Sequence, residues 1–186
     1  MSKIGIFLAE GMEEIEGLTV VDILRRAGVE AVTISIQGRK EVTGSHGITV
    51  LADAIFEEMD FAGLDGIVLP GGMPGTTNLM NHTGVNQIIR AFAAEGKLVA
   101  AICAAPSVLG NAGVLKGKRA TCYPGFEEKL TGASVCIQQV IQDENIVTSR
   151  GMGTAIPFAL ALTSYCVGQE KAEEIRASIL FDHIEE

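Results

Sequence analysis

The sequence predicts an α/β protein with a doubly wound, mostly parallel sheet between two layers of helices. Short, almost uninterrupted apolar segments, typical of strands buried on both faces, alternate with segments whose apolar residues recur at helical spacing. Such an alternation favours parallel strands joined by crossover helices. With 186 residues, 47% of them hydrophobic, the chain is expected to form a single domain over residues 1–186 with a large core.

The N-terminal part is predicted to run strand, helix, strand and hairpin. The helix has acidic residues at its start, arginines near its end and Gly28 after it, as helix ends favour. The hairpin is indicated by two apolar segments that bracket a Gly-Ser-His-Gly turn. The expected elements are a strand at 3–9, a helix carrying Ile15, Leu18, Val21 and Leu24, a strand at 29–36 and a hairpin within 37–53.

Two further core strands are expected in the middle of the chain, at 65–69 and 97–102, and each ends in an abrupt turn. A short helical turn at 55–59 comes before the first of them. An amphipathic helix that stops at Gly96 comes before the second. Pro106 then fits the first turn of another helix, because its missing N–H loses no hydrogen bond there.

The C-terminal part combines short strands with two longer helices. The helix that ends at Val167, with Thr154 as its expected cap, is apolar nearly all round, which predicts that it is buried. The expected elements are a strand at 119–122, a turn at 123–125, a short helix at 126–130, an antiparallel strand pair at 135–141 and 146–149, and helices at 154–167 and 169–181.

Composition and charge exclude several classes of function. The net charge of -9 and the pI near 4.8 argue against a nucleic acid or an anionic membrane as partner. No apolar stretch is long enough for a membrane span, and the first residues lead directly into strand-like sequence without a signal peptide, so a cytoplasmic location is expected. Cysteines and histidines lack the spacing of metal ligands, so no metal site is expected and the cysteines are expected to be thiols.

Cys103 is the first candidate functional residue. Ala101-x-Cys103-x-Ala105 has the small-x-nucleophile-x-small pattern of a nucleophile elbow, a tight turn from strand to helix. A thiol there lies at the carboxyl edge of the sheet and beside a helix N-terminus, which favours the thiolate. The alternative is a packing role, because free cysteine is among the most buried residue types.

Two other loops follow core strands and are expected to meet Cys103 at the same edge of the sheet. The Gly71–Gly72 pair is either a tight turn or a source of backbone N–H donors for an oxyanion hole. Glu13 and Glu14 are typical of a solvated helix start that matches the helix dipole. Glu16 differs because it lies beside the apolar stripe; turned inward, it would have a raised pKa and a proton to donate to a thiolate.

The histidines offer Cys103 no evident partner. Ala104 directly follows the cysteine, so a Cys-His pair built from adjacent elbow residues is absent. We expect His46 and His82 to lie in a surface loop or at a helix start. No P-loop is present, and the glycine-rich segments lack the full dinucleotide-binding pattern.

These segments together resemble the DJ-1/ThiJ/PfpI superfamily, and specifically its small DJ-1-like branch. The resemblance extends almost end to end. It is carried by Leu8-Ala9-x-Gly11-x-Glu13-Glu14-x-Glu16, Val21-Asp22-x-x-Arg25-Arg26-Ala27-Gly28, Val68-Leu69-Pro70-Gly71-Gly72, Ala100-Ala101-Ile102-Cys103-Ala104-Ala105-Pro106 and Thr148-Ser149-Arg150-Gly151-x-Gly153-Thr154. The resemblance implies a flavodoxin-like sandwich, usually a homodimer, with a site that needs no cofactor.

The resemblance also implies roles for individual residues. Cys103 matches the reactive cysteine and Glu16 the protonated glutamate that hydrogen-bonds its sulfur. Gly72 and Ala104 match backbone donors around the site. Arg26, together with the hairpin of a partner subunit, would lie near the pocket mouth.

Three residues depart from relatives in the superfamily. Ala104 stands where the protease-like branch has histidine, which counts against peptidase activity. Tyr123 stands where some DJ-1-like members have a pocket histidine, and His46 where some have arginine. These two changes put proton shuttling and anion binding at the pocket in doubt.

The leading hypothesis is a cofactor-independent, glyoxalase- or deglycase-like enzyme that acts on small reactive aldehydes or glycated adducts. Cys103 would form a hemithioacetal and Glu16 would act as general acid and base. The second hypothesis is a redox-responsive stress protein or chaperone that senses oxidation at Cys103. A PfpI-type peptidase or amidase ranks last because it would need a base from elsewhere.

Overall fold

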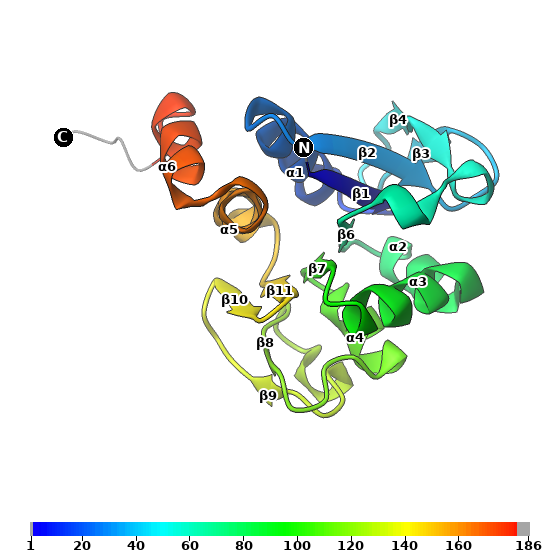
Figure 1. The fold of residues 1–186 in the computed structure, drawn as a ribbon. Helices are drawn as coiled ribbons and strands as arrows, with labels where there is room; N and C mark the ends of the chain where they lie inside the picture. Colours follow the sequence, from blue (N-terminus) through cyan, green and yellow to red (C-terminus); the bar gives the residue numbers. More distant parts are fainter. Residues whose placement is uncertain (1, 182–186) are drawn as a thin grey trace.

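A computed structural model describes residues 2–181, whose strands form one central seven-stranded sheet and two small two-stranded sheets (Figure 1). In the central sheet the strand order is β10-β11-β7-β6-β1-β2-β5, and every neighbouring pair is parallel except β10 with β11. Its strands are β1 (Lys3–Leu8), β2 (Glu30–Ser35), β5 (Ala54–Ile55), β6 (Gly66–Leu69), β7 (Leu98–Ile102), β10 (Val140–Asp143) and β11 (Ile146–Ser149).

The small sheets lie outside this central sheet. One is the antiparallel hairpin of β3 (Glu41–Thr43) and β4 (Thr49–Leu51), and the other pairs β8 (Arg119–Ala120) with β9 (Ser134–Val135). Short 3-10 turns are η1 (Phe56–Glu58), η2 (Phe61–Gly63), η3 (Glu127–Lys129) and η4 (Met152–Thr154).

Helices cover the two faces of the central sheet as two separate groups (Figure 1). One group contains α1 (Glu14–Arg26), α5 (Ala155–Val167) and α6 (Gln169–Ser178); the other contains α2 (Gly75–Asn81), α3 (Thr83–Ala94) and α4 (Pro106–Ala112). No helix in the described part of the chain is long and apolar enough to cross a membrane.

Alternation along each central strand divides the core into two layers. In β7, Leu98, Ala100 and Ile102 pack toward α1 and α5, whereas Val99 and Ala101 pack toward α3 and α4. All five residues are fully buried, which explains why the strand reads as one continuous apolar segment. The predicted α/β fold with a doubly wound, mostly parallel sheet is confirmed.

The order of the strands reverses between β1 and β6, which are neighbours in the sheet. The chain adds β2 on one side of this pair and β7 and β11 on the other. The loops that follow β1, β6 and β7 therefore meet at one edge, where doubly wound folds bind ligands. Glu13, in the loop after β1, donates its backbone N–H to Gly71 O after β6 at 2.9 Å.

Several elements differ from the sequence predictions. The sequence does not predict helix α2, because its Gly-Thr-Thr-Asn start has low helix propensity. The strand expected at 135–141 is two strands, β9 and β10, in different sheets. Helix α5 is not buried all round, since Tyr165 is 37% and Val167 40% exposed. Thr154 precedes α5, but its hydroxyl contacts Gly151 and Ser149 and caps no α5 N–H.

Candidate active site

Cys103 lies at the turn between β7 and α4 in a left-handed backbone conformation, with φ of 66°. Non-glycine residues rarely adopt this conformation, because it costs energy that the surrounding structure must supply. Two backbone hydrogen bonds hold it: Cys103 N–H donates to Ser149 O at 3.0 Å, and Cys103 O accepts from Tyr123 N–H at 2.8 Å. The side chain is partly exposed and packs against the α1–α5 core layer.

Glu16 lies in the first turn of α1 with its side chain turned inward, and it is 1% exposed. Its Oε2 accepts a hydrogen bond of 2.8 Å from Gly71 N–H. Its Oε1 is buried without a nitrogen or oxygen donor in residues 2–181, and the carboxyl group interacts with the Cys103 thiol. The carboxyl group is therefore held between the Gly71 amide and the sulfur.

Gly71 is the close-contact point between these two side chains. A Cβ added to it would lie 2.6 Å from Cys103 Cβ and 2.7 Å from Glu16 Oε2, closer than real Cβ contacts allow. Its N–H is already used by Glu16, so the expectation that Gly71 supplies an oxyanion-hole donor is wrong for this arrangement. Its function in the fold is to hold the Glu16 carboxyl group in position.

Gly72 and Ala104 present backbone N–H groups to the Cys103 thiol, and both hydrogen bonds favour its ionised form. Gly72 adopts a positive φ of 84°, and an added Cβ would lie 2.2 Å from Glu13 N. Only glycine allows the two loops to approach this closely at that conformation.

Burial raises the pKa of Glu16 to about 7. Burial and then the charge of the Glu16 carboxylate raise the pKa of Cys103 to about 12. While Glu16 is ionised, burial and then its like charge therefore keep the thiol protonated, contrary to the expectation that the position favours a thiolate. When the pair holds a single proton, moving it from sulfur to carboxyl oxygen gives a thiolate next to a neutral acid.

The other predicted pocket residues lie farther out. Tyr123 is 50% exposed and its ring lies close to Gly151. Arg26 forms an ion pair with Asp22 at 2.7 Å. It is near the opposite end of α1 from Glu16, about 15 Å along the helix axis at 1.5 Å per residue. Within one chain Arg26 is therefore not next to Cys103, and its place at a mouth shared with a second chain stays a prediction.

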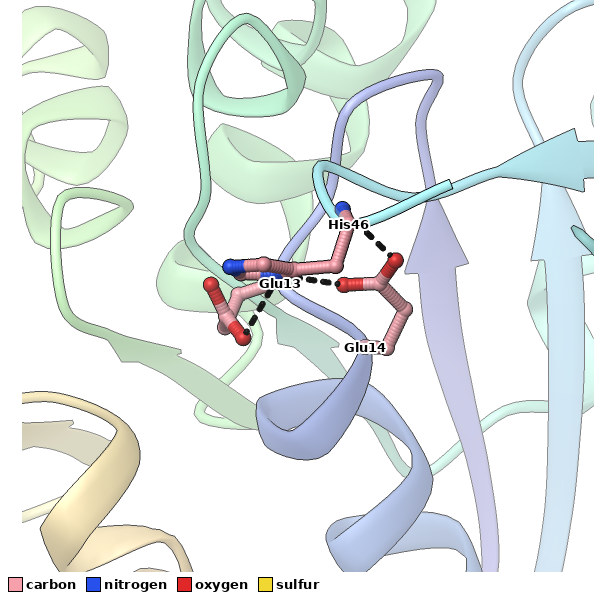
Figure 2. A group of neighbouring side chains, drawn as sticks. All are labelled: Glu13, Glu14 and His46. Atoms are coloured by element: carbon pink, nitrogen blue, oxygen red, sulfur yellow. Dashed lines mark hydrogen bonds and ion pairs between the residues drawn. The ribbon is translucent and has the colours of Figure 1, made fainter. Parts of the chain in front are cut away.

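His46 lies in the β3–β4 turn, and its imidazole contacts Glu13 and Glu14 at the start of α1 (Figure 2). Its Nδ1 is 3.1 Å from Glu14 Oε2, and this contact, then the charge of Glu13, raises the pKa of His46. Glu14 is only 3% exposed, so the expectation of a solvated carboxylate is wrong. Burial raises the pKa of Glu14, but hydrogen bonds from its own backbone N–H, from the His46 ring and from the backbone N–H groups of residues 46 and 48 together lower it to about 2.

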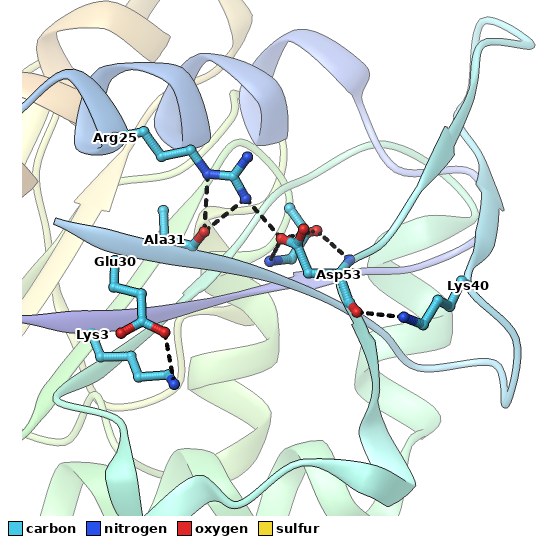
Figure 3. Close-up of polar contacts among 7 residues, drawn as sticks. Lys3, Arg25, Glu30, Ala31, Lys40 and Asp53 are labelled. Carbon is cyan, nitrogen blue, oxygen red and sulfur yellow. Dashed lines mark hydrogen bonds and ion pairs between the residues drawn. The ribbon is translucent and has the colours of Figure 1, made fainter. Parts of the chain in front are cut away.

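Asp53 attaches the far end of this hairpin to the sheet (Figure 3). Its Oδ2 accepts hydrogen bonds from Thr33 N, Thr33 Oγ1 and Arg25 Nη2 at 2.9, 2.7 and 2.7 Å. Its backbone O accepts one from Lys40 Nζ at 2.7 Å. The hairpin that carries His46 is thus held at both ends, by Glu14 at the turn and by Asp53 at the base.

Comparison with known proteins gives relatives along most of the chain. Residues 2–164 match the DJ-1/PfpI family. The chain is 37% identical over 180 residues to Protein DJ-1 homolog B of Arabidopsis thaliana, covering 96% of this chain but only 41% of that longer protein. It is 37% identical over 153 residues to a protein named a deglycase from Pyrococcus abyssi, covering 81% of this chain and 91% of the relative.

The fold agrees with the sequence comparison. The structure of oxidized Toxoplasma gondii DJ-1 superposes with a TM-score of 0.94 and 35% identity, covering 98% of this chain and 100% of that one. Sequence, fold and the order of the motifs therefore lead to one conclusion: the chain belongs to the DJ-1/PfpI family, in its DJ-1-like branch.

Proposed function

We propose that the chain converts small 2-oxoaldehydes into 2-hydroxy acids without a cofactor, with Cys103 as nucleophile and Glu16 as general acid and base. The observation that carries this proposal is the buried Glu16 carboxyl group, bonded to Gly71 N–H on one oxygen and next to the Cys103 thiol. A carboxyl group with a pKa of about 7 both donates and accepts a proton near neutral pH.

The proposed reaction begins when the proton of the pair lies on Glu16. The Cys103 thiolate attacks the aldehyde carbon, and the Glu16 proton goes to the carbonyl oxygen to give a hemithioacetal. The Glu16 carboxylate then removes the proton from that carbon and returns it to the neighbouring carbon, while the hydroxyl proton of the hemithioacetal moves to the neighbouring oxygen. The product is a thioester of the 2-hydroxy acid. Water hydrolyses the thioester, which releases the acid and restores the thiol, so the net change is addition of one water.

Glycated adducts form a related substrate class. The Pyrococcus abyssi relative is named a deglycase, which supports reactive carbonyl compounds or their adducts as substrates of this chain. Release of an amine or thiol from a hemiaminal or hemithioacetal yields the same aldehyde carbon for Cys103. Removal of adducts and conversion of the free aldehyde would therefore use the same reaction at Cys103.

The test is release of lactate from methylglyoxal by wild type, Cys103→Ser and Glu16→Gln, with Cys136→Ser as a matched thiol control. We expect both site variants to lose at least about 100-fold in kcat/KM, within the range of nucleophile and general acid–base contributions. Cys136→Ser should match wild type. Equal turnover by wild type and both site variants would overturn the mechanism.

A second candidate function is redox response at Cys103. Its side chain is partly exposed and adjoins a carboxyl group that donates a hydrogen bond to a sulfinate when protonated. The structurally similar Toxoplasma gondii protein is described as oxidized. Mild peroxide followed by mass spectrometry distinguishes this function: two oxygens gained at Cys103 alone, with negligible aldehyde turnover, favour it. Similar oxidation of all four cysteines rules it out.

We propose a homodimer in a reducing, cytoplasmic compartment. Ile15 and Leu18 of α1 are 49% and 38% exposed, and Ile48 and Leu51 of the hairpin region are 55% and 70% exposed. Exposed apolar side chains gathered on neighbouring elements support an interaction surface. All four cysteines are free thiols, which is consistent with a reducing compartment.

A further inference from the structure

Glu13, Glu14 and His46 place three potential metal ligands together outside the Cys103–Glu16 pair (Figure 2). Nδ1 of His46 is 3.1 Å from Glu14 Oε2 and 3.5 Å from Glu13 Oε1, and the three donor atoms lie within 4.8 Å of one another. We propose that these residues form a binding site for a divalent transition-metal ion of the Zn²⁺ type.

The separations between the donor atoms suit such an ion. Zinc binds nitrogen and oxygen at about 2.0–2.2 Å, so neighbouring ligand atoms in a tetrahedral site lie about 3.3–3.5 Å apart. The two distances from His46 Nδ1, 3.1 and 3.5 Å, are close to this value. The remaining distance, between the two carboxylate oxygens, is adjustable through Glu13, the less deeply buried of the two side chains.

Glu14 is fixed in the orientation that a ligand needs. Its Oε1 accepts hydrogen bonds from the backbone N–H groups of His46 and Ile48 at 2.9 and 3.3 Å, which leaves Oε2 facing the imidazole. A Cβ added to Gly44 would lie 2.2 Å from Glu14 Cδ, so the turn closes tightly over this carboxylate. Hydrogen bonds of this kind orient the side chains that bind a metal ion directly.

Charge also favours a cation. In the described part of the chain, His46 is the only basic side chain that forms an ion pair with Glu13 or Glu14. One imidazole balances at most one of two carboxylates, and its single Nδ1–H serves one acceptor at a time. A divalent ion in place of that proton, which leaves to solvent, balances both carboxylates.

The donor set selects the type of metal. One imidazole nitrogen with two carboxylate oxygens suits Zn²⁺ and its neighbours, whereas Mg²⁺ and Ca²⁺ prefer oxygen alone. The His46 side chain is 65% exposed in the single chain, which leaves room beside it for water in the remaining position of the ion. Three protein ligands plus water is the arrangement of open zinc sites.

The test is isothermal titration of the full-length, metal-free, reduced protein with Zn²⁺. We expect one ion per chain, and at least a 10-fold weaker affinity in His46→Asn and in Glu13→Gln. His82→Asn is the matched histidine control, because His82 caps α3 through Nδ1 and asparagine keeps a capping acceptor. Glu14 is left unchanged because it also holds the hairpin turn.

Cys103→Ser separates this site from the reactive thiol. We expect Cys103→Ser and His82→Asn to bind Zn²⁺ as wild type does, and Co²⁺ to show visible absorption without a thiolate-to-metal band. Equal affinity in wild type and His46→Asn would overturn the proposal. So would absence of binding, or loss of the ion in Cys103→Ser. Thermal unfolding checks that each variant is folded.

Discussion

The backbone N–H of Gly71 donates to Glu16 Oε2 at 2.8 Å across a sequence separation of 55 residues. This bond joins the loop after β6 to the start of α1 and directs the carboxyl group toward Cys103. The same glycine lies against Cys103 Cβ. Its backbone therefore fixes the position of the Glu16 carboxyl group relative to the Cys103 thiol, the two proposed catalytic groups.

Gly71→Ala is therefore expected to damage the site more than the fold. The added methyl group overlaps Cys103 Cβ and Glu16 Oε2, so the carboxyl group must move. We expect a loss of about 1–3 kcal/mol in the free energy of unfolding, typical of overpacking, and at least about 10-fold lower aldehyde turnover. Urea unfolding and lactate release measure the two effects. Gly63→Ala is the control, since its Cβ meets nothing within 4 Å; equal effects of the two substitutions would contradict the prediction.

Burial of Glu16 is expected to make stability fall as pH rises from 4.5 to about 7. In that window the unfolded state has released this proton and the folded state still holds it, because the folded pKa is raised from 4.5 to about 7. Above a pH of about 7 Glu16 is ionised in the folded state too, and the loss in the free energy of unfolding is complete. It amounts to about 3 kcal/mol or less, since each pKa unit is worth about 1.4 kcal/mol.

Glu16→Gln removes this titration. Urea unfolding at pH 4.5 and pH 8 should show a smaller loss of stability in Glu16→Gln than in wild type. Cys103→Ser, which keeps the carboxyl group buried, should retain most of the wild-type slope. Parallel pH curves for wild type and Glu16→Gln would show that Glu16 does not carry this titration.

Glu14 is expected to have the opposite effect on the pH dependence of stability: it makes stability fall as the pH is lowered. Its pKa is lowered to about 2, so its contribution is present above pH 4.5 and is lost as pH falls toward 2. Glu14→Gln should lower the free energy of unfolding at pH 7 by about 1–3 kcal/mol, the range for hydrogen bonds to charged groups. The deficit should shrink at pH 3. Glu57→Gln, on an exposed 3-10 turn, is the control, and an equal deficit there would argue against a special role for Glu14.

Much of the fold can be predicted from local sequence. Strands β1, β6 and β7 are nearly continuous apolar segments buried on both faces, and β2 is indicated by its β-branched residues, so the positions of these strands follow from local composition. Helix α2 could not be predicted in this way, because its first residues have weak helix propensity and are held by close packing of Gly75 against the backbone of Met12. The sequence predicts one strand where the structure has β9 and β10, because the alternation of apolar and polar residues does not show where a chain passes from one sheet to another.

The site is only partly readable from sequence, because its electrostatics depend on distant residues. Glu16 lies beside the apolar stripe of α1, and its side chain is buried. Glu14 gives no such signal, because its donors come from a hairpin 32 and 34 residues away. The raised pKa of Cys103 likewise depends on its burial and then on the position of the Glu16 charge, and no local motif contains either.

The proposed homodimer predicts that charge on the exposed face of α1 separates the subunits. Leu18→Asp and Ile15→Lys place a charge where an apolar contact is expected, and burying an unpaired charge costs several kcal/mol. Sedimentation velocity should give a dimer for wild type and a monomer for both variants. Ile137→Lys is the matched control, because Ile137 is 82% exposed on a different part of the surface, and it should remain dimeric. A monomeric wild type, or a dimer in both α1 variants, would place the subunit contact elsewhere or exclude it.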